Sequence, residues 1–187
     1  MLAKTNINKQ NQGMMIVSNE ADWRLGELVN LSWNHKEIKK SGGKSYAYYA
    51  ESHYVCVREA TDGQRGILLK GLGKIHREHV MLVNGEPFCK DEREDLFMGK
   101  RYFSLPFPTA DELKEALDIV RSDMNIQQIL IDNGMFFNPN GTFWVSDTKS
   151  QFFGLKRSPQ YYDPSTGCLA TANSLDERHN RITIAYF

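Results

Sequence analysis

Histidines and their neighbouring carboxylates are the groups in this sequence of 187 residues that could do acid–base chemistry. His76 and His79 stand three residues apart with Glu78 between them. On a helix, this spacing could direct both imidazoles to one metal ion. The spacing differs from the HExxH pattern of zinc hydrolases, and no third ligand is obvious nearby in the sequence. We therefore expect a charged loop or strand edge here, and neither a metal nor a cofactor.

A cysteine nucleophile with a histidine base is a second possible chemistry. Cys56 and His53 lie in one strand-like run, but side chains three residues apart on a strand point to opposite faces. A buried structural cysteine is the better interpretation. Residues 42–45, Gly-Gly-Lys-Ser, lack the earlier glycine of a phosphate-binding loop. A small hydrolase that uses His53, His76 or His79 stays open as an alternative, although we assign no catalytic residue.

Aromatic and cationic side chains near the C-terminus could instead bind a ligand. Phe153, Tyr161 and Tyr162 flank an expected polar loop that contains Lys156 and Arg157. Tyrosine and arginine often dominate binding surfaces and can stack on sugars or bases. The competing interpretation is that these rings belong to the core.

Two further polar groups belong to this candidate set. Asp163 opens the sequence Asp-Pro-Ser-Thr-Gly, which favours a turn over a calcium loop because no glutamate follows at EF-hand spacing. Arg178 lies in the polar cluster 177–181, which we expect to be an exposed loop of the kind that carries recognition. The candidate ligand-binding residues are thus Phe153, Lys156, Arg157, Tyr161, Tyr162, Asp163 and Arg178.

Helical signals are concentrated in the middle of the chain. Thr109 and Glu112 form a capping box, and apolar residues follow at helical spacing for about three turns. A second, weaker helix from Asn125 should bury residues 126, 129 and 130 and stop at Gly134. Leu25, Leu28 and Val29 also have helical spacing, but Gly26 weakens that pattern.

Strand signals occupy most of the remaining sequence. Strands are expected at 46–57, 66–70, 135–137, 142–145 and 181–187, with a hairpin over 80–88 whose turn is Asn84-Gly85. The resulting fold class is α+β, with antiparallel strands, one clear helix and one or two weaker ones. Residues 14–187 are interpreted as a single domain, and residues 1–13 as a polar, flexible or extended arm.

Composition excludes several classes of protein. Lys+Arg and Asp+Glu both number 23, so nothing in the net charge favours nucleic acid as a partner. No apolar run approaches the length of a membrane span, and the run 14–17 is too short for a signal peptide. Three alternatives stay open for the compartment: the protein stays in the cytoplasm, it is exported by another route, or an earlier leader has been removed. Cys56, Cys89 and Cys168 allow one bridge and a free thiol, or three buried thiols.

The C-terminal half, residues 100–187, resembles the fibrobacter-type major paralogous domain. Residues 107–113, Phe-Pro-Thr-Ala-Asp-Glu-Leu, resemble the start of that family's helix. Residues 143–147, Phe-Trp-Val-Ser-Asp, resemble its Tyr-Trp-Ser-Ser strand, and residues 181–187 resemble its closing strand. The sequence departs from the family in having Ser-Leu-Pro-Phe before Pro108 and Asp147 for the second serine. It also lacks the Ala-Trp element of the next strand.

The resemblance implies a C-type-lectin-like fold. Members of such families are mostly binding domains at bacterial surfaces or in phage particles, and no catalytic residues carry over. The implied function is non-enzymatic recognition or adhesion, with a glycan or protein ligand bound by the loops of 152–178. A cell-surface or virion location follows from the resemblance, while a cytoplasmic one stays possible. The alternative is a structural subunit of a virion or appendage, whose polar arm contacts an assembly partner or another copy.

Overall fold

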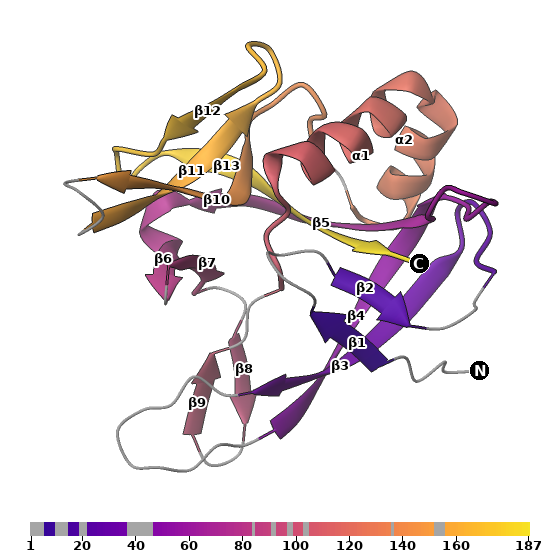
Figure 1. Ribbon diagram of the computed structural model, residues 1–187, viewed down its shortest axis with the longest axis horizontal. Coiled ribbons are helices and arrows are strands. Elements are labelled where there is room, and N and C mark those ends of the chain that lie inside the picture. Colours follow the sequence, from indigo (N-terminus) through magenta and orange to yellow (C-terminus); the bar gives the residue numbers. More distant parts are fainter. Residues whose placement is uncertain are drawn as a thin grey trace.

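The computed structural model describes the backbone of residues 6–9, 15–18, 22–36, 47–83, 85–90, 93–96, 99–102, 105–135, 137–151 and 156–187. Side chains are described within 22–31, 52–82, 85–90, 105–135, 137–148 and 158–187. Two helices and a largely antiparallel sheet confirm the α+β class (Figure 1). No helix among the described residues is both long enough and apolar enough to cross a membrane.

One sheet of nine strands organises the fold. Its main path runs β12-β11-β10-β13-β5-β4-β3, while β2 pairs with the end of β13 and β1 pairs with β2. The bounds are β1 (Asn6–Lys9), β2 (Met15–Ser18), β3 (Leu28–Lys36), β4 (Ala47–Arg58), β5 (Ile67–His76), β10 (Phe143–Gln151), β11 (Lys156–Asp163), β12 (Cys168–Thr171) and β13 (Arg178–Tyr186). The contacts of β13 with β10 and β2 are parallel, and the other pairings are antiparallel.

Two short hairpins lie outside this sheet. The strands β6 (Val80–Val83) and β7 (Glu86–Cys89) pair antiparallel, which confirms the expected hairpin around residues 84–85. Gly85 has a positive φ of 79°, a value that a tight hairpin turn requires and that glycine adopts without strain. The second hairpin joins β8 (Arg93–Leu96) to β9 (Gly99–Tyr102). Its β8 strand falls within the polar stretch after Lys90.

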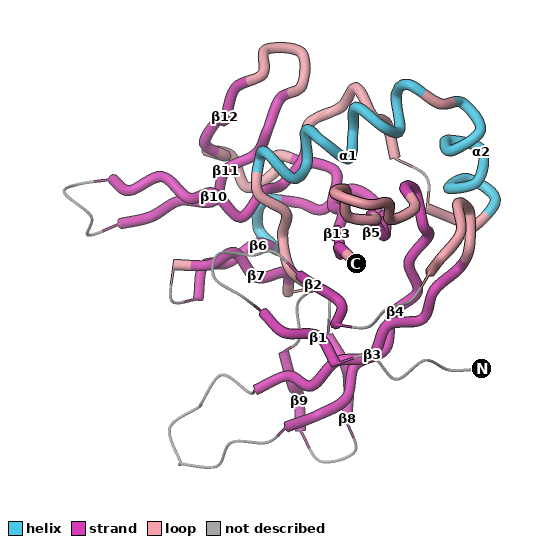
Figure 2. Tube along the Cα trace, turned by 45° about the vertical axis from the view of Figure 1, so that its right-hand side comes forward, coloured by secondary structure: helices cyan, strands magenta, loops and turns pink. Residues whose placement is uncertain are grey.

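The helices α1 (Ala110–Ser122) and α2 (Met124–Asp132) cover one face of the sheet (Figure 2). The predicted capping box is present: the Thr109 hydroxyl accepts from the Glu112 amide at 3.2 Å, and Glu112 accepts from the Thr109 amide at 3.1 Å. Because Glu112 is buried in this role, desolvation raises the pKa of its carboxyl group. The expected second helix and its end near Gly134 are confirmed as well.

The closing strand β13 is buried on both faces. Ile182, Ile184 and Tyr186 pack against the helices, together with Leu113 and Leu117 of α1. On the opposite face, Ala185 joins a second cluster around Trp23, whose ring meets Phe187 edge-on at 4.9 Å. The expected alternation over 181–187 is therefore confirmed, and a strand covered on both faces belongs in the middle of a sheet.

The structure resolves one ambiguous pattern, and one local expectation, the strand at 135–137, was wrong. The stretch with helical spacing enters strand β3 at Leu28, because Gly26 donates to the carbonyl of Cys56 and the Cys56 amide donates to Glu27. Pairing with β4 thus overrides a weak helical pattern. At 135–137, Met135 and Phe137 are buried against the core without belonging to a strand. Their hydrophobicity reflects packing beneath α2, with the Met135 amide donating to the carbonyl of Leu130.

All three cysteines lie among the described residues, and no disulfide joins them. Cys56 and Cys89 are buried and Cys168 is exposed. Burial raises the pKa of the Cys56 thiol to about 11, so the thiolate that a nucleophile requires is absent at neutral pH. A structural role for Cys56 is consistent with this burial.

Candidate functional site

The candidate residues Lys156 and Arg157 lie in strand β11, which pairs with the end of β10. Residues 156–158 were expected to form a polar loop, and that expectation was wrong because their backbone groups complete the β10–β11 ladder. The side chains of Lys156 and Arg157 lie outside the described residues, as does Phe153 entirely.

The two tyrosines of β11 face opposite sides of the sheet. Tyr162 is 7% exposed and lies in the core beneath the helices, opposite Phe143 of β10. The ring of Tyr162 therefore does not belong to the candidate ligand surface. For this residue, the competing interpretation, that the aromatic rings belong to the core, is confirmed. Tyr161 lies on the other face, opposite Trp144, where it is partly buried and stacks on the imidazole of His179 with ring centroids 3.8 Å apart.

Asp163 ends β11 at the turn to β12, and Arg178 begins β13. The Asp163 carboxylate accepts from the Ser165 hydroxyl at 2.6 Å and from its amide at 2.9 Å, which lowers the Asp163 pKa and confirms the turn. Arg178 is exposed at the start of β13. The expected exposed loop over 177–181 was otherwise wrong, because His179, Asn180 and Arg181 are buried in β13.

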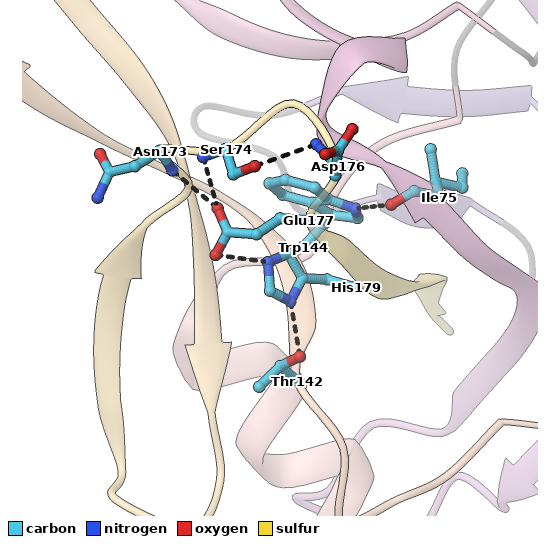
Figure 3. A network of polar contacts seen from close by, with 8 residues as sticks. All are labelled: Ile75, Thr142, Trp144, Asn173, Ser174, Asp176, Glu177 and His179. Atoms are coloured by element: carbon cyan, nitrogen blue, oxygen red, sulfur yellow. Dashed lines mark hydrogen bonds and ion pairs between the residues drawn. The ribbon is translucent and has the colours of Figure 1, made fainter.

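A buried polar network surrounds His179, which is 6% exposed (Figure 3). Its Nδ1 lies 2.6 Å from the hydroxyl of Thr142, and its Nε2 lies 3.8 Å from a carboxylate oxygen of Glu177. Trp144 meets the imidazole edge-on at 4.7 Å and donates its indole N–H to the carbonyl of Ile75 at 3.0 Å. Desolvation lowers the pKa of His179 to about 4, so the imidazole is neutral at pH 7.

Glu177 connects this network to the loop 172–177 that precedes β13. Its second carboxylate oxygen accepts from the amides of Asn173 and Ser174, at 2.8 and 3.2 Å. The Ser174 hydroxyl accepts from the amide of Asp176 at 3.3 Å, and the carbonyl of Glu177 accepts from the amide of Arg77 at 2.8 Å. The loop is thus fixed both internally and to the short helix η1 (Arg77–His79).

Where a hydroxyl, a neutral imidazole and a carboxylate lie next to one another in that order, the imidazole can activate the hydroxyl as a nucleophile. Several features oppose that use of Thr142, His179 and Glu177. Tyr161 and Trp144 cover the imidazole, so substrate has little access to it. Glu177 approaches His179 only at 3.8 Å, beyond hydrogen-bond distance, while it accepts from two loop amides. The network positions a loop and a tryptophan.

Arg181 is fully buried and joins β13 to the segment that precedes α1. Its guanidinium donates to the carbonyls of Leu105 and Pro106, and it lies 3.7 Å from the centroid of the Phe107 ring. These acceptors, together with the carbonyl of Ile182 at 2.8 Å, replace the hydration of the cation, which makes its burial tolerable. The sequence placed Arg181 at the start of an alternating apolar strand, but its burial depends on which face of that strand meets the core.

The histidines proposed for acid–base chemistry do not converge on one centre. His53 is exposed on β4, whereas His76 and His79 lie at the end of β5 and in η1, with ring centroids 5.9 Å apart. His79 lies 3.2 Å from the carboxylate of Glu78. Within the described part of the chain, no cluster of three His, Cys, Asp or Glu side chains could hold a metal ion.

A hollow of about 320 Å³ lies elsewhere, between α1, α2 and the segment 137–139. Its lining is mostly aliphatic and includes Leu130 and Phe137, and it contains none of the candidate ligand-binding residues. Comparison with known proteins finds no match to a protein-family model, to a curated protein or to a solved structure.

Proposed function

We propose that this chain is a non-enzymatic recognition domain of C-type-lectin-like architecture that binds a glycan or protein ligand. The proposed surface is the loop edge, defined as loop 172–177, η1 and Arg178 at the start of β13. The chain would act in adhesion at a bacterial or phage surface.

The observation that carries this proposal is that the loop edge has a fixed backbone and exposed side chains. Leu175 is 61% exposed, although its carbonyl accepts from the amide of Glu78 at 3.4 Å. Arg178 is exposed although its strand is paired with β5. A surface whose backbone is already ordered loses less conformational entropy on binding. Apolar and cationic side chains on such a surface are suited to recognition.

Two features support the C-type-lectin-like architecture. The closing strand β13 pairs antiparallel with β5, so the C-terminal strand joins the N-terminal half while the helices and the β10–β12 region lie between them in sequence. Loop 172–177 also connects, through Glu177 and His179, to the buried Trp144 of β10. A closing strand without such a partner, or a Trp144 without a loop beside it, would have argued against the resemblance.

The proposal is tested by screening the full chain against a glycan array and whole bacterial cells. The loop-edge variant combines Leu175→Ser with Arg178→Gln, and the matched control combines Leu25→Ser with Arg24→Gln. Leu25 and Arg24 are also exposed, but they precede β3. We expect binding by the wild type and the control, and a loss of at least about tenfold in affinity for the loop-edge variant.

Circular dichroism and urea unfolding establish that both variants are folded. Equal binding by the two folded variants would contradict the loop edge as the binding surface. An absence of binding by the wild type to every array member and every cell type would contradict the recognition function itself.

A further inference from the structure

We propose that an oxyanion, such as a carboxylate or a sulfate, binds beside the loop edge on a cationic strip, formed by the cations Lys74 and Arg178 together with the imidazole of His76. This inference rests on the proposed recognition function and names the chemical class of the ligand.

The sheet register places these three side chains together. Arg178 of β13 lies directly opposite His76 of β5, and Asn180 lies opposite Lys74. Directly opposite residues project to the same face, with Cβ atoms about 5 Å apart. Successive residues alternate between faces, so Lys74, His76 and Arg178 share one face.

The alternation also separates the strip from the buried network. Ile75, between Lys74 and His76, and His179, next to Arg178, are opposite each other and buried on the other face. Lys74 and Arg178 are exposed and His76 is half-buried. The strip therefore faces solvent. Loop 172–177 beside it is fixed by the buried network of Glu177 and His179.

The charges on the strip also favour an anionic ligand. The ion pairs found among the described residues involve none of Lys74, His76 and Arg178. Glu177, the carboxylate adjacent to Arg178 in sequence, accepts from two loop amides and approaches His179. Lys74 lies diagonally across from Arg178 on the neighbouring strand, at a separation that long side chains can span. An anion bound between the ammonium of Lys74 and the guanidinium of Arg178 would offset the repulsion between these two cations.

The side-chain types specify the chemical class of that anion. A guanidinium offers two parallel N–H donors that match the two oxygens of a carboxylate or sulfate. A lysine ammonium adds a point charge, and an imidazole adds one N–H donor. A neutral ligand would leave the charges of Lys74 and Arg178 without an opposite charge. Acidic sugars carry a carboxylate, and sulfated sugars carry a sulfate, so both contain the required group.

The test is a titration of the isotope-labelled full chain, followed by backbone amide chemical shifts. The probes are sodium glucuronate, sodium sulfate and neutral glucose, with ionic strength held constant by sodium chloride. We expect saturable shifts at 74–79 and 173–178 with either anion and none with glucose. The anion with the lower dissociation constant identifies the carboxylate or the sulfate as the preferred group.

Matched variants decide whether the strip is responsible. Arg178→Gln should weaken anion binding about tenfold, because the paired donors are lost. Arg24→Gln removes an exposed arginine elsewhere and should leave binding unchanged. Lys74→Gln should weaken it less than Arg178→Gln. Equal dissociation constants for Arg178→Gln and the wild type would overturn the proposal, as would wild-type shifts that do not saturate.

Failure of this inference is distinguishable from failure of the recognition function. If the array and cell screen shows binding that depends on the loop edge but the wild type ignores both anions, the oxyanion is wrong and recognition stands. If both anions bind through Arg178 while the screen shows no binding, the strip stands and the recognition function fails.

Discussion

One face of β13 carries Ile182, Ile184 and Tyr186, and the other carries His179, Arg181 and Thr183; both faces are buried. The first face packs against the helices by hydrophobic contact, which depends on area and tolerates small shifts. On the second face, each polar group requires a partner in a particular direction. The difference shows why one face supports stability broadly while the other fixes particular segments in place.

The partners on the polar face come from distant parts of the chain. Arg181 donates to the segment before α1, and Thr183 lies 3.4 Å from the phenol oxygen of Tyr54 in β4. His179 contacts Thr142, which immediately precedes β10. Each contact thus joins β13 to a different element, so loss of one contact should disturb one junction. The following predictions compare the two faces, beginning with the largest expected effect.

Arg181→Ala should lower the free energy of unfolding by about 4 kcal/mol, because it leaves buried backbone carbonyls without their donor and removes the cation from Phe107. Urea unfolding measures this change. Arg178→Ala, which removes an exposed arginine from the same strand, should cost within about 0.5 kcal/mol. Similar losses for the two variants would show that the buried contacts of Arg181 contribute little.

Ile182→Ala should cost about 3 kcal/mol, because it removes a fully buried aliphatic group from the helix-covered core. Hydrogen exchange should show faster opening in α1 and in β13 together, since the apolar face is shared between them. In Arg181→Ala, we expect the additional exchange at 105–108 instead. If both variants gave the same exchange pattern, the proposed separation between the two faces would be contradicted.

Acidification should destabilise the polar face specifically. The pKa of His179 falls from an ordinary 6.5 to about 4 on folding, so the unfolded chain binds the proton more readily. The contribution of the neutral, buried His179 to the free energy of unfolding is therefore complete above pH 6.5 and is lost as the pH falls towards 4. Linkage gives a loss of about 2 kcal/mol between pH 7.5 and pH 5.

The histidine contribution is isolated by comparing variants across that pH range. His179→Gln should show a weaker dependence of unfolding free energy on pH than the wild type, and His53→Gln, which removes an exposed histidine of β4, is the matched control. A wild-type slope in His179→Gln would refute the assignment to His179. The wild type should also expose loop 172–177 to proteolysis at pH 5 before it unfolds globally.

Thr109→Ala has the smallest expected effect, about 1 kcal/mol, because it removes one side of the α1 capping box and leaves the core intact. Thr109→Ser keeps the hydroxyl and should recover most of the loss. Thermal unfolding of the two variants measures the difference. If Thr109→Ser and Thr109→Ala were equally destabilised, the hydroxyl–amide bond would not be the source of the stability.

The most predictable elements were those whose signals lie within a few residues. The capping box at Thr109 and the hairpin at Gly85 could be predicted because each depends on short-range hydrogen bonds or on a positive φ. The α+β class followed from the separation of helical and strand patterns. By contrast, Leu28 and Val29 were ambiguous, since pairing with β4 determined their conformation.

The candidate site was predicted less completely. Arg178 was recognised as an exposed cation, and Asp163 as the start of a turn. Tyr162 and the buried part of 177–181 could not be placed, because exposure depends on which face of a strand meets the core. The contact between Thr142 and His179 joins residues 37 positions apart and has no local signature. The cationic strip depends on the register of β5 and β13.

The sequence by itself determined the class of the fold, the α1 boundary and the apolar alternation of the closing strand, because local hydrogen bonds and side-chain periodicity act over a few residues. Only the tertiary structure decided that His179 and Arg181 are buried, that Tyr161 and Tyr162 face opposite environments, and that Lys74, His76 and Arg178 meet. These outcomes depend on strand register and on partners distant in the chain, which the order of residues does not display.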